Sequence, residues 1–302
     1  MDITFFSLGP KVIDFYMHFC VSMAKNPPTI HSYPAKLMLF GEYTALLGGH
    51  VLATPLLSLQ AHWDWGQRFP HPQLEQNLHE VTKIYPFLHF DHQKWQNWIQ
   101  NMGFLYSSVP VGYGLGSSGN LIAALYDGFF TTESGFQPDL LTLKAILGYL
   151  ESYFHGSSSG VDPLISYTQK TLLFTPQKVE ETPLTPEILA QFHTIDSGQR
   201  RNTEALVKDF KSRLSDSNFK SQMEILANYN LQAIEAMISG NQTEVQTHFY
   251  NISKLQYTHL THLITPNLKD DWKKGLDTGE NMIKICGAGG GGYYLKCRIC
   301  KK

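Results

Sequence analysis

The sequence predicts an α+β protein made of two lobes. Its 302 residues, 42% of them hydrophobic, can bury a substantial core, and the length alone suggests about two domains. A run rich in β-formers at residues 104–109 precedes a glycine loop, and apolar residues at helical density follow from residue 121. Beyond residue 188, helical and strand patterns are interspersed. Together these observations favour mixed helices and sheets.

The first lobe is predicted to begin with two strands. Residues 36–40 read as a buried strand and residues 51–65 as further strand, with a turn at Gly48 and Gly49 between them. Later in this lobe, Asp139 is followed by apolar residues at helical spacing, which predicts a capped amphipathic helix.

The second lobe is predicted to begin near Ile188. Residues 176–190 carry three prolines and are the best linker in the chain. Helices are expected over residues 202–210, 219–238, 242–255 and 268–276, and strands over residues 192–195, 282–286 and 293–297.

Three glycine-containing stretches share the chemistry of phosphate handling: residues 34–43, 114–119 and 287–292. Glycine lets the backbone approach an anion closely, and unpaired amides at a helix N-terminus attract its charge. Ser117 and Ser118 add hydroxyls that can cap the helix or hold a magnesium ion between phosphates. A capped helix after a glycine turn is an equal alternative for this loop alone. The spacing fits neither a Walker A motif nor a Rossmann fingerprint.

Two carboxylates follow in the same lobe. Glu151 lies near the C-terminal end of the helix that begins after Asp139, where the dipole disfavours a carboxylate unless a cation compensates it. Asp162 closes a loop of small residues, which leaves a substrate room to reach a general base. Taken singly, a solvated Glu and a capping Asp explain them better. Their combination with the glycine loops favours a catalytic site.

Composition narrows the partners and the compartment. The formal net charge is -2 with basic residues scattered along the chain, so nucleic acid is not an expected partner. Four cysteines do not make a disulfide framework at this length, which favours the cytoplasm. No apolar run in the first thirty residues reaches a membrane-spanning length.

Metal-binding patterns are weak in the sequence. Cys297 and Cys300 have C-x-x-C spacing, but no second pair or nearby His pair completes a zinc site. His89, Asp91 and His92 lie close together in the sequence, and a polar turn after Tyr85 and Pro86 explains them at least as well as a metal site. Trp95 and Trp98 have the spacing of one helix face, and they are interpreted as packing residues rather than a nucleotide clamp.

The motifs resemble those of the GHMP kinase superfamily, which includes galactokinase, homoserine kinase, mevalonate kinase and phosphomevalonate kinase. Pro-x-Lys-x-x-Leu-x-Gly-Glu from residue 34, Gly-Leu-Gly-Ser-Ser from residue 114 and the glycine run ending at residue 292 occur in the family's order. Within the superfamily, the stretch from Glu151 to Asp162 and the segment at residues 196–207 resemble mevalonate kinase.

The resemblance implies a role for each motif residue. Asp162 would take the proton from the substrate hydroxyl, Lys36 would lie beside it and hold substrate, and Ser118 and Glu151 would ligate Mg²⁺. The ATP phosphates would be bound by Gly114, Leu115, Gly116, Ser117, Ser118 and Gly119. The acceptor side of the site would be shaped by Glu42, Tyr43, His155, Ser159, Thr203, Gly287, Ala288, Gly289 and Gly290.

The resemblance also implies a two-lobed GHMP kinase fold. Residues 1–28 would be an N-terminal extension, residues 29–185 a ribosomal protein S5-like ATP-binding domain, and residues 186–302 a ferredoxin-like domain that is short at its end. Arg200 or Arg201 offers a bidentate fork for a substrate carboxylate, with a merely solvated role as an equal alternative.

The expected activity is ATP- and Mg²⁺-dependent phosphorylation of a primary hydroxyl, with mevalonate as the first choice of acceptor and isoprenoid precursor synthesis as its context. Tyr43 and Gly119 resemble phosphomevalonate kinases more closely, so phosphomevalonate or another GHMP acceptor stays open. A non-catalytic ligand sensor of the same fold and a decarboxylating relative stay open as well. The expected partners are the small acid and ATP, without a membrane, and a homodimer is left open.

Overall fold

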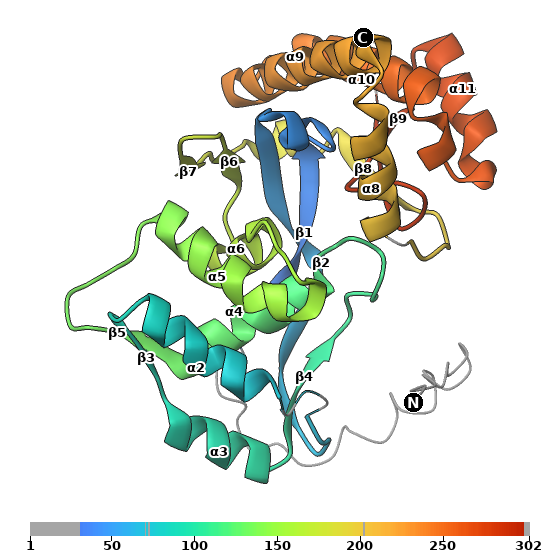
Figure 1. Cartoon of the computed structure of the whole chain (residues 1–302). Helices are drawn as coiled ribbons and strands as arrows, with labels where there is room; N and C mark the ends of the chain where they lie inside the picture. Colours follow the sequence, from blue (N-terminus) through green and yellow to red (C-terminus); the bar gives the residue numbers. More distant parts are fainter. Residues whose placement is uncertain (1–30, 70, 72, 202, 299–302) are drawn as a thin grey trace. The chain divides into compact units, whose positions relative to one another are not determined.

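The structure is a computed structural model that describes residues 31–69, 71, 73–201 and 203–298 (Figure 1). By its internal contacts the chain divides into residues 1–31 and residues 32–302, and the fold described below belongs to the second unit. The extension expected over residues 1–28 lies outside the described residues. In the described part of the chain, no helix combines the length and the hydropathy needed to cross a membrane.

An antiparallel sheet organises the first half of this unit. Its strands are β1 (Ser32–Phe40), β2 (Val51–Trp65), β6 (Leu172–Phe174) and β7 (Val179–Glu181), paired in that order, with β4 (Gly103–Ser107) also on β2. β6 pairs with the start of β2 and β4 with its end. The one-turn helix η1 (Thr44–Leu47) joins β1 to β2 and ends at Gly48, as the glycine turn predicted. Both long strands expected from the sequence are confirmed.

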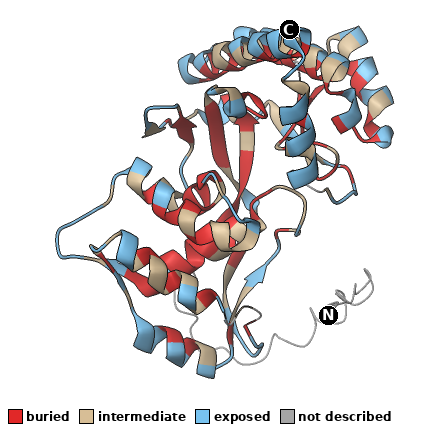
Figure 2. Ribbon diagram, viewed as in Figure 1, coloured by how far each residue is buried: buried red, intermediate tan, exposed pale blue. Residues whose placement is uncertain are grey.

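Three helices cover this sheet: α4 (Ser117–Phe129), α5 (Leu140–His155) and α6 (Val161–Thr168) (Figure 1). α4 packs on β1, β2 and α6, and Figure 2 shows buried residues concentrated in α4 and along β1 and β2. α5 begins where the sequence predicted, because Asp139 accepts a hydrogen bond from the Thr142 amide at 2.7 Å.

The remaining elements of the first half are α2 (Leu74–Ile84), β3 (Leu88–Phe90), α3 (His92–Gln100) and β5 (Phe130–Thr132). Trp95 and Trp98 of α3 are buried, which confirms them as packing residues. The polar turn expected around His89 is wrong. His89 pairs with Thr131 in the ladder between β3 and β5, and Asp91 starts α3 by accepting the Lys94 amide at 2.8 Å.

The second half contains an antiparallel sheet in the order β8 (Phe192–Asp196), β10 (Tyr293–Cys297), β9 (Met282–Ile285). Its helices are α7 (Pro186–Leu189), α8 (Thr203–Arg213), α9 (Ser217–Ser239), α10 (Gln242–His259) and α11 (Lys269–Thr278), with single turns η2 (Thr261–Leu263) and η3 (Pro266–Leu268). The helices and strands expected here are confirmed, with small shifts of their ends.

The expected linker at residues 176–190 contains regular structure. β7 pairs with β6, and α7 starts where Thr185 accepts the Ile188 amide and Pro186 takes the first helical position. Pro186 therefore starts a helix here. The domain boundary near residue 186 stays a prediction.

Two large hydrophobic cores and two small clusters lie among the described residues of the second unit. The first large core gathers α2 to α6 on the first sheet, and the second large core gathers α8 to α11 on the second sheet. Leu37, Leu39 and Phe40 of β1 belong to the second core, although β1 is a strand of the first sheet. β1 therefore ties the two halves together, and it carries the lysine of the first motif.

Candidate active site

Lys36 on β1 and Asp162 on α6 form an ion pair, with Lys36 Nζ 2.9 Å from Asp162 Oδ1. The lysine side chain is 5% exposed, whereas the aspartate side chain is 29% exposed. Asp162 is the second residue of α6, so its carboxylate lies at the N-terminus of that helix as well as beside the ammonium. The arrangement presents a carboxylate to solvent beside a buried lysine.

The glycine loop of residues 114–119 lies directly against this pair. The Lys36 amide donates to the Leu115 carbonyl at 2.9 Å, which fixes the loop on β1. Gly116, with φ of 78°, precedes α4, and a Cβ on it would lie 3.2 Å from Asp162 Oδ2. The first turn of α4 starts with Ser117 and Ser118, whose amides have no acceptor within the helix. A helix N-terminus suited to an anion thus lies beside Asp162.

A second carboxylate meets the loop at Ser118. The Ser118 hydroxyl donates to Glu151 Oε1 at 2.8 Å and lies 3.0 Å from His155 Nε2, while Ser158 donates to Glu151 Oε2. Burial raises the pKa of Glu151 to about 7, and the charge of Asp162 adds to the rise. The hydrogen bonds from Ser158 and Ser118 and the charge of Lys36 oppose it.

Ser118 and Glu151 fit a hard divalent cation such as Mg²⁺. Their oxygen atoms are the donor type that Mg²⁺ prefers, and they already lie within hydrogen-bonding distance of each other. The raised pKa of Glu151 also favours a cation at this place. Burial and the charge of Asp162 both disfavour an ionised Glu151, and a bound cation would offset them. Sequence reasoning missed Ser158, since nothing in the local pattern shows that its hydroxyl turns back to α5.

Arg201 links the second and third glycine stretches. A Cβ on Gly114 would lie 1.5 Å from Arg201 Nη2 and one on Gly287 would lie 2.7 Å from it, so the guanidinium fills space that both glycines leave. Arg201 Nη1 donates to the Cys286 carbonyl at 3.2 Å. Burial lowers the pKa of Arg201, while nearby groups including Asp162 oppose this. Of the two arginines singled out from the sequence, Arg201 lies at the site, whereas Arg200 is exposed.

The first stretch meets the third stretch through Tyr43 and meets β9 through Glu42. The Tyr43 hydroxyl donates to the Ala288 carbonyl at 2.6 Å. Glu42 forms an ion pair with Lys284 of β9, and both side chains are fully buried. Burial raises the pKa of Glu42, and Lys284 opposes the rise. The structure therefore gives Glu42 a place in the interior, where it holds the end of β1 to β9.

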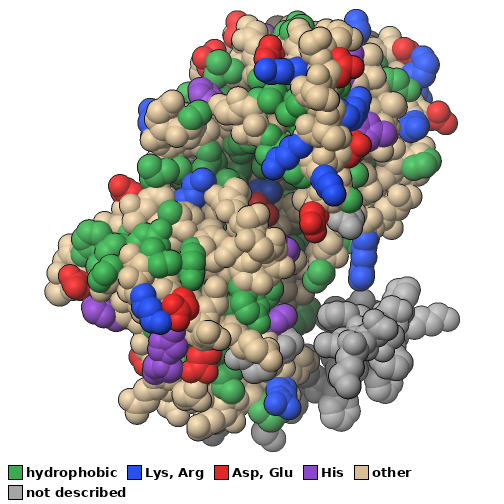
Figure 3. Space-filling model, viewed as in Figure 1, with side chains coloured by type: hydrophobic (Ala, Val, Ile, Leu, Met, Phe, Trp, Pro, Cys, Tyr) green, Lys and Arg blue, Asp and Glu red, His purple; other side chains and the backbone are tan. Residues whose placement is uncertain are grey.

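The other residues expected to shape the acceptor side are more dispersed. The Ser159 hydroxyl accepts the Val161 amide at 3.4 Å, beside Asp162. Gly289 packs against Leu263, the Gly290 amide donates to the Leu263 carbonyl at 2.6 Å, and Thr203 is the exposed first residue of α8. Figure 3 shows a hollow between the surfaces of the two halves, with basic and acidic side chains inside it.

Comparison with known proteins identifies the fold. No family model matches the chain. Its sequence is 24% identical over 290 residues to a mevalonate kinase of Archaeoglobus fulgidus, covering 87% of this chain and 90% of that protein. Its structure is similar to L. major mevalonate kinase in complex with R-mevalonate, with a TM-score of 0.61, 15% identity, and coverage of 91% of this chain and 88% of the other.

A phosphomevalonate kinase of Streptococcus pneumoniae in complex with phosphomevalonate and AMPPNP is similar to the same degree. Its TM-score is 0.62 at 16% identity, with coverage of 91% of this chain and 93% of the other. The chain thus has the two-lobed fold of the GHMP kinases. Its resemblance to that superfamily is confirmed, and within the superfamily its sequence matches a mevalonate kinase.

Proposed function

We propose that this chain is an ATP- and Mg²⁺-dependent kinase that phosphorylates a primary hydroxyl of a small carboxylic acid. The pairing of Lys36 with Asp162 at the N-terminus of α4 carries the proposal. An anion bound at that helix end would lie beside a carboxylate that is paired with a lysine and reachable from solvent. Phosphoryl transfer needs mainly alignment and charge neutralisation, and this arrangement supplies both.

Each residue of the candidate site has its own role in the proposed phosphoryl transfer. The amides of residues 117–119 and the glycines before them bind the phosphate chain of ATP. Asp162 accepts the hydroxyl proton as the hydroxyl oxygen bonds to the γ-phosphorus and the bond to the β–γ bridging oxygen breaks, releasing ADP. Lys36 neutralises charge near the reacting oxygen. Ser118 and Glu151 would hold Mg²⁺, which neutralises phosphate charge when bound.

Mevalonate is the acceptor that we propose. The sequence similarity to the Archaeoglobus fulgidus mevalonate kinase supports it, and Arg201 offers a planar fork for the acceptor carboxylate. Phosphomevalonate is the second candidate, since the phosphomevalonate kinase structure is equally similar and Tyr43 and Gly119 match the pattern of that family.

The test is an ADP-release assay of the purified chain with ATP, Mg²⁺ and, in turn, mevalonate, phosphomevalonate, homoserine and galactose. We expect turnover with mevalonate and a loss of at least about 1,000-fold in kcat for Asp162→Asn, with ATP binding retained. Asp277→Asn, in an exposed ion pair on α11, is the matched control.

Each result has one interpretation. Turnover of a different acceptor, with none on mevalonate, would contradict the proposed acceptor but support the proposed kinase activity. ATP binding without turnover of any acceptor would favour the ligand sensor. In a separate assay with ATP and diphosphomevalonate, release of carbon dioxide would favour the decarboxylase. Full activity of Asp162→Asn would remove Asp162 as the base.

A further inference from the structure

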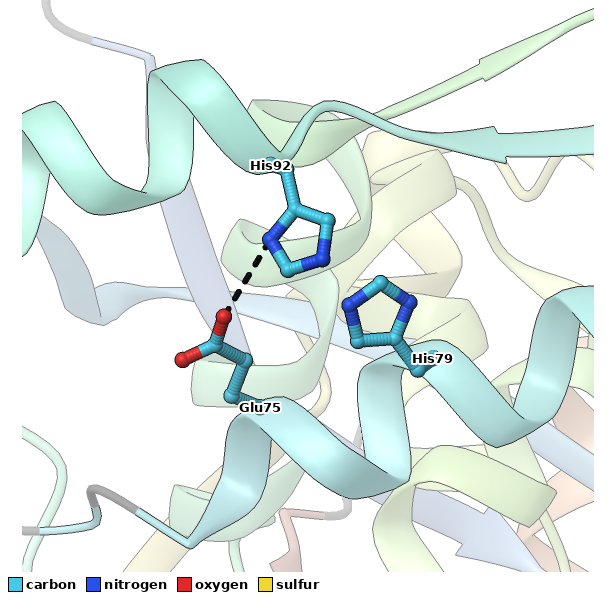
Figure 4. Close-up of side chains that lie close together, drawn as sticks. All are labelled: Glu75, His79 and His92. Carbon is cyan, nitrogen blue, oxygen red and sulfur yellow. Dashed lines mark ion pairs between the residues drawn. The ribbon is translucent and has the colours of Figure 1, made fainter.

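A second group of chemically competent side chains lies on α2 and α3, outside the candidate active site. Glu75 and His79 are one helical turn apart on α2, and His92 is the first residue of α3. Figure 4 shows both α2 side chains pointing toward His92. Each of the three residues offers one ligand atom within 4.8 Å of the other two, and no other such trio occurs among the described residues.

The individual distances come close to those of a bound metal. His92 Nδ1 lies 3.2 Å from Glu75 Oε1, and the rings of His79 and His92 have their centroids 3.9 Å apart. A tetrahedral zinc ion with bonds of about 2.0–2.1 Å places its ligand atoms roughly 3.4 Å apart. One edge of such a tetrahedron therefore already has the required length. A change in the side-chain torsions of His79 would bring its ring nitrogen to a similar distance from the other two ligand atoms.

Both helices that carry these ligands are firmly placed. α2 is anchored by the buried side chains of Leu74 and Leu78, and α3 by Trp95. The Asp91 carboxylate caps α3 and so fixes the position of His92. Ligands on anchored helices lose little freedom when they bind an ion.

The surroundings also suit a metal. Gln96 Nε2 donates to Glu75 Oε1 at 2.9 Å, which orients the carboxylate as outer hydrogen bonds do in known sites. The Phe90 ring lies 5.0 Å from the His79 ring and 5.2 Å from the His92 ring, forming an apolar wall behind both imidazoles. The nearby Lys83 ammonium is paired with Glu80 at 2.6 Å.

We propose that Glu75, His79 and His92 bind a divalent transition-metal ion of the zinc class. Two imidazoles and one carboxylate are a donor set that zinc prefers, and soft thiolates are not needed for it. The side chain of His92 is 51% exposed, so an ion can enter from solvent and a water molecule can take the fourth position.

The ion would join α2 to α3. The segment between them contains only β3 as regular structure, and β3 pairs with the three-residue strand β5. A metal bound by both helices binds the folded state and not the unfolded chain, so it raises the unfolding temperature. The proposal is therefore independent of the kinase reaction and can be tested without an activity assay.

The experiment is a titration of the full-length, tag-free chain with Zn²⁺ followed by calorimetry, in parallel with a Co²⁺ titration followed by its visible absorption. The background carries Cys297→Ser and Cys300→Ser, which removes the C-x-x-C thiols as competing ligands. We expect about one ion per chain, an intense tetrahedral Co²⁺ band, and a rise of several degrees in Tm.

His79→Ala and His92→Ala should each weaken binding by at least about 100-fold and abolish the Co²⁺ band. His89→Ala, an exposed histidine on the adjacent strand β3, should leave both unchanged. Circular dichroism in the presence of a chelator establishes that each variant is folded. Equal binding by the His79 and His92 variants, or no saturable binding by the parent chain, would overturn the proposal.

Discussion

The Lys36 ammonium lies 2.9 Å from the Asp162 carboxylate, although the two residues belong to β1 and α6 and are far apart in the sequence. The lysine is held by a strand that contributes to the second core while pairing in the first sheet. The aspartate begins a helix that packs on the same strand. The pair is therefore fixed by the packing of both halves, which is what a catalytic base needs for alignment.

Replacing Lys36 with Met should reduce kcat by about 100-fold or more while changing ATP affinity little. The methionine keeps most of the buried volume but removes the charge beside Asp162. Steady-state kinetics and calorimetric titration with ATP measure the two effects. Lys273→Met, at an exposed position on α11, is the control, and a Lys36 variant as active as this control would contradict the assignment.

The pH dependence of stability should report the state of Glu151. Its folded-state pKa of about 7 lies above the ordinary value of 4.5, so the folded chain holds this proton more tightly than the unfolded chain. The stabilising contribution is fully present below pH 4.5 and is lost as the pH rises through about 7.

We therefore expect Glu151→Gln to be more stable than the parent chain at pH 8 without metal, by on the order of 1–3 kcal/mol. The difference should narrow as the pH falls and close below about pH 4.5. Calorimetric unfolding across this range, with a chelator present, measures it. Glu235→Gln on the exposed face of α9 gives the baseline for an exposed glutamate. A stability difference independent of pH would contradict the raised pKa.

Gly160→Ala should destabilise the start of α6. Gly160 has φ of 71°, and a Cβ there would lie 2.1 Å from the Lys144 carbonyl of α5. Gly156 has φ of 69° with no heavy atom within 4 Å of its would-be Cβ, so Gly156→Ala isolates the cost of the backbone conformation. Urea unfolding should show a loss of about 1 kcal/mol for Gly156→Ala and at least twice that for Gly160→Ala. Equal losses would mean that α5 and α6 separate easily.

The buried pair of Glu42 and Lys284 should be strongly coupled. Glu42→Gln and Lys284→Met each leave one group without its partner in the interior, at a cost of about 3–5 kcal/mol in unfolding free energy. The double variant should lose clearly less than the sum of the two, because neither charge is then stranded. Urea unfolding of all four proteins closes the cycle. Additive losses would show that the two side chains do not depend on each other.

Arg201→Gln should raise the KM for the acid acceptor at least tenfold, whereas Arg200→Gln should change it little. Arg201 lies between the glycine stretches and near Asp162, while Arg200 is exposed. Arg201→Lys keeps the charge without the bidentate fork and should give an intermediate KM. If Arg201→Gln acts by disturbing the fold rather than by losing a contact with the acceptor's carboxylate, the affinity for ATP will fall together with the affinity for the acceptor. That result would contradict a role for Arg201 in binding the acceptor.

Much of the fold could be predicted from local patterns. The strand at residues 51–65, the Asp139 cap and the helices and strands after residue 188 depend on periodicity and capping within short windows. The prediction of a turn around His89 was wrong, because the pairing of β3 with β5 depends on a partner strand elsewhere in the chain. A three-residue strand carries too little local signal to be recognised.

The sequence by itself determined which residue types were available: glycines for close approach of an anion, the Lys36 and Asp162 motifs, and the carboxylate at Glu151. Only the tertiary structure decided that Ser158 bonds to Glu151, that Arg201 rather than Arg200 enters the site, and that His92 meets Glu75 and His79. The physical reason is that motifs depend on backbone geometry over a few residues. Charge pairs and ligand groups depend instead on distances set by how helices pack, and no short window of sequence contains those distances.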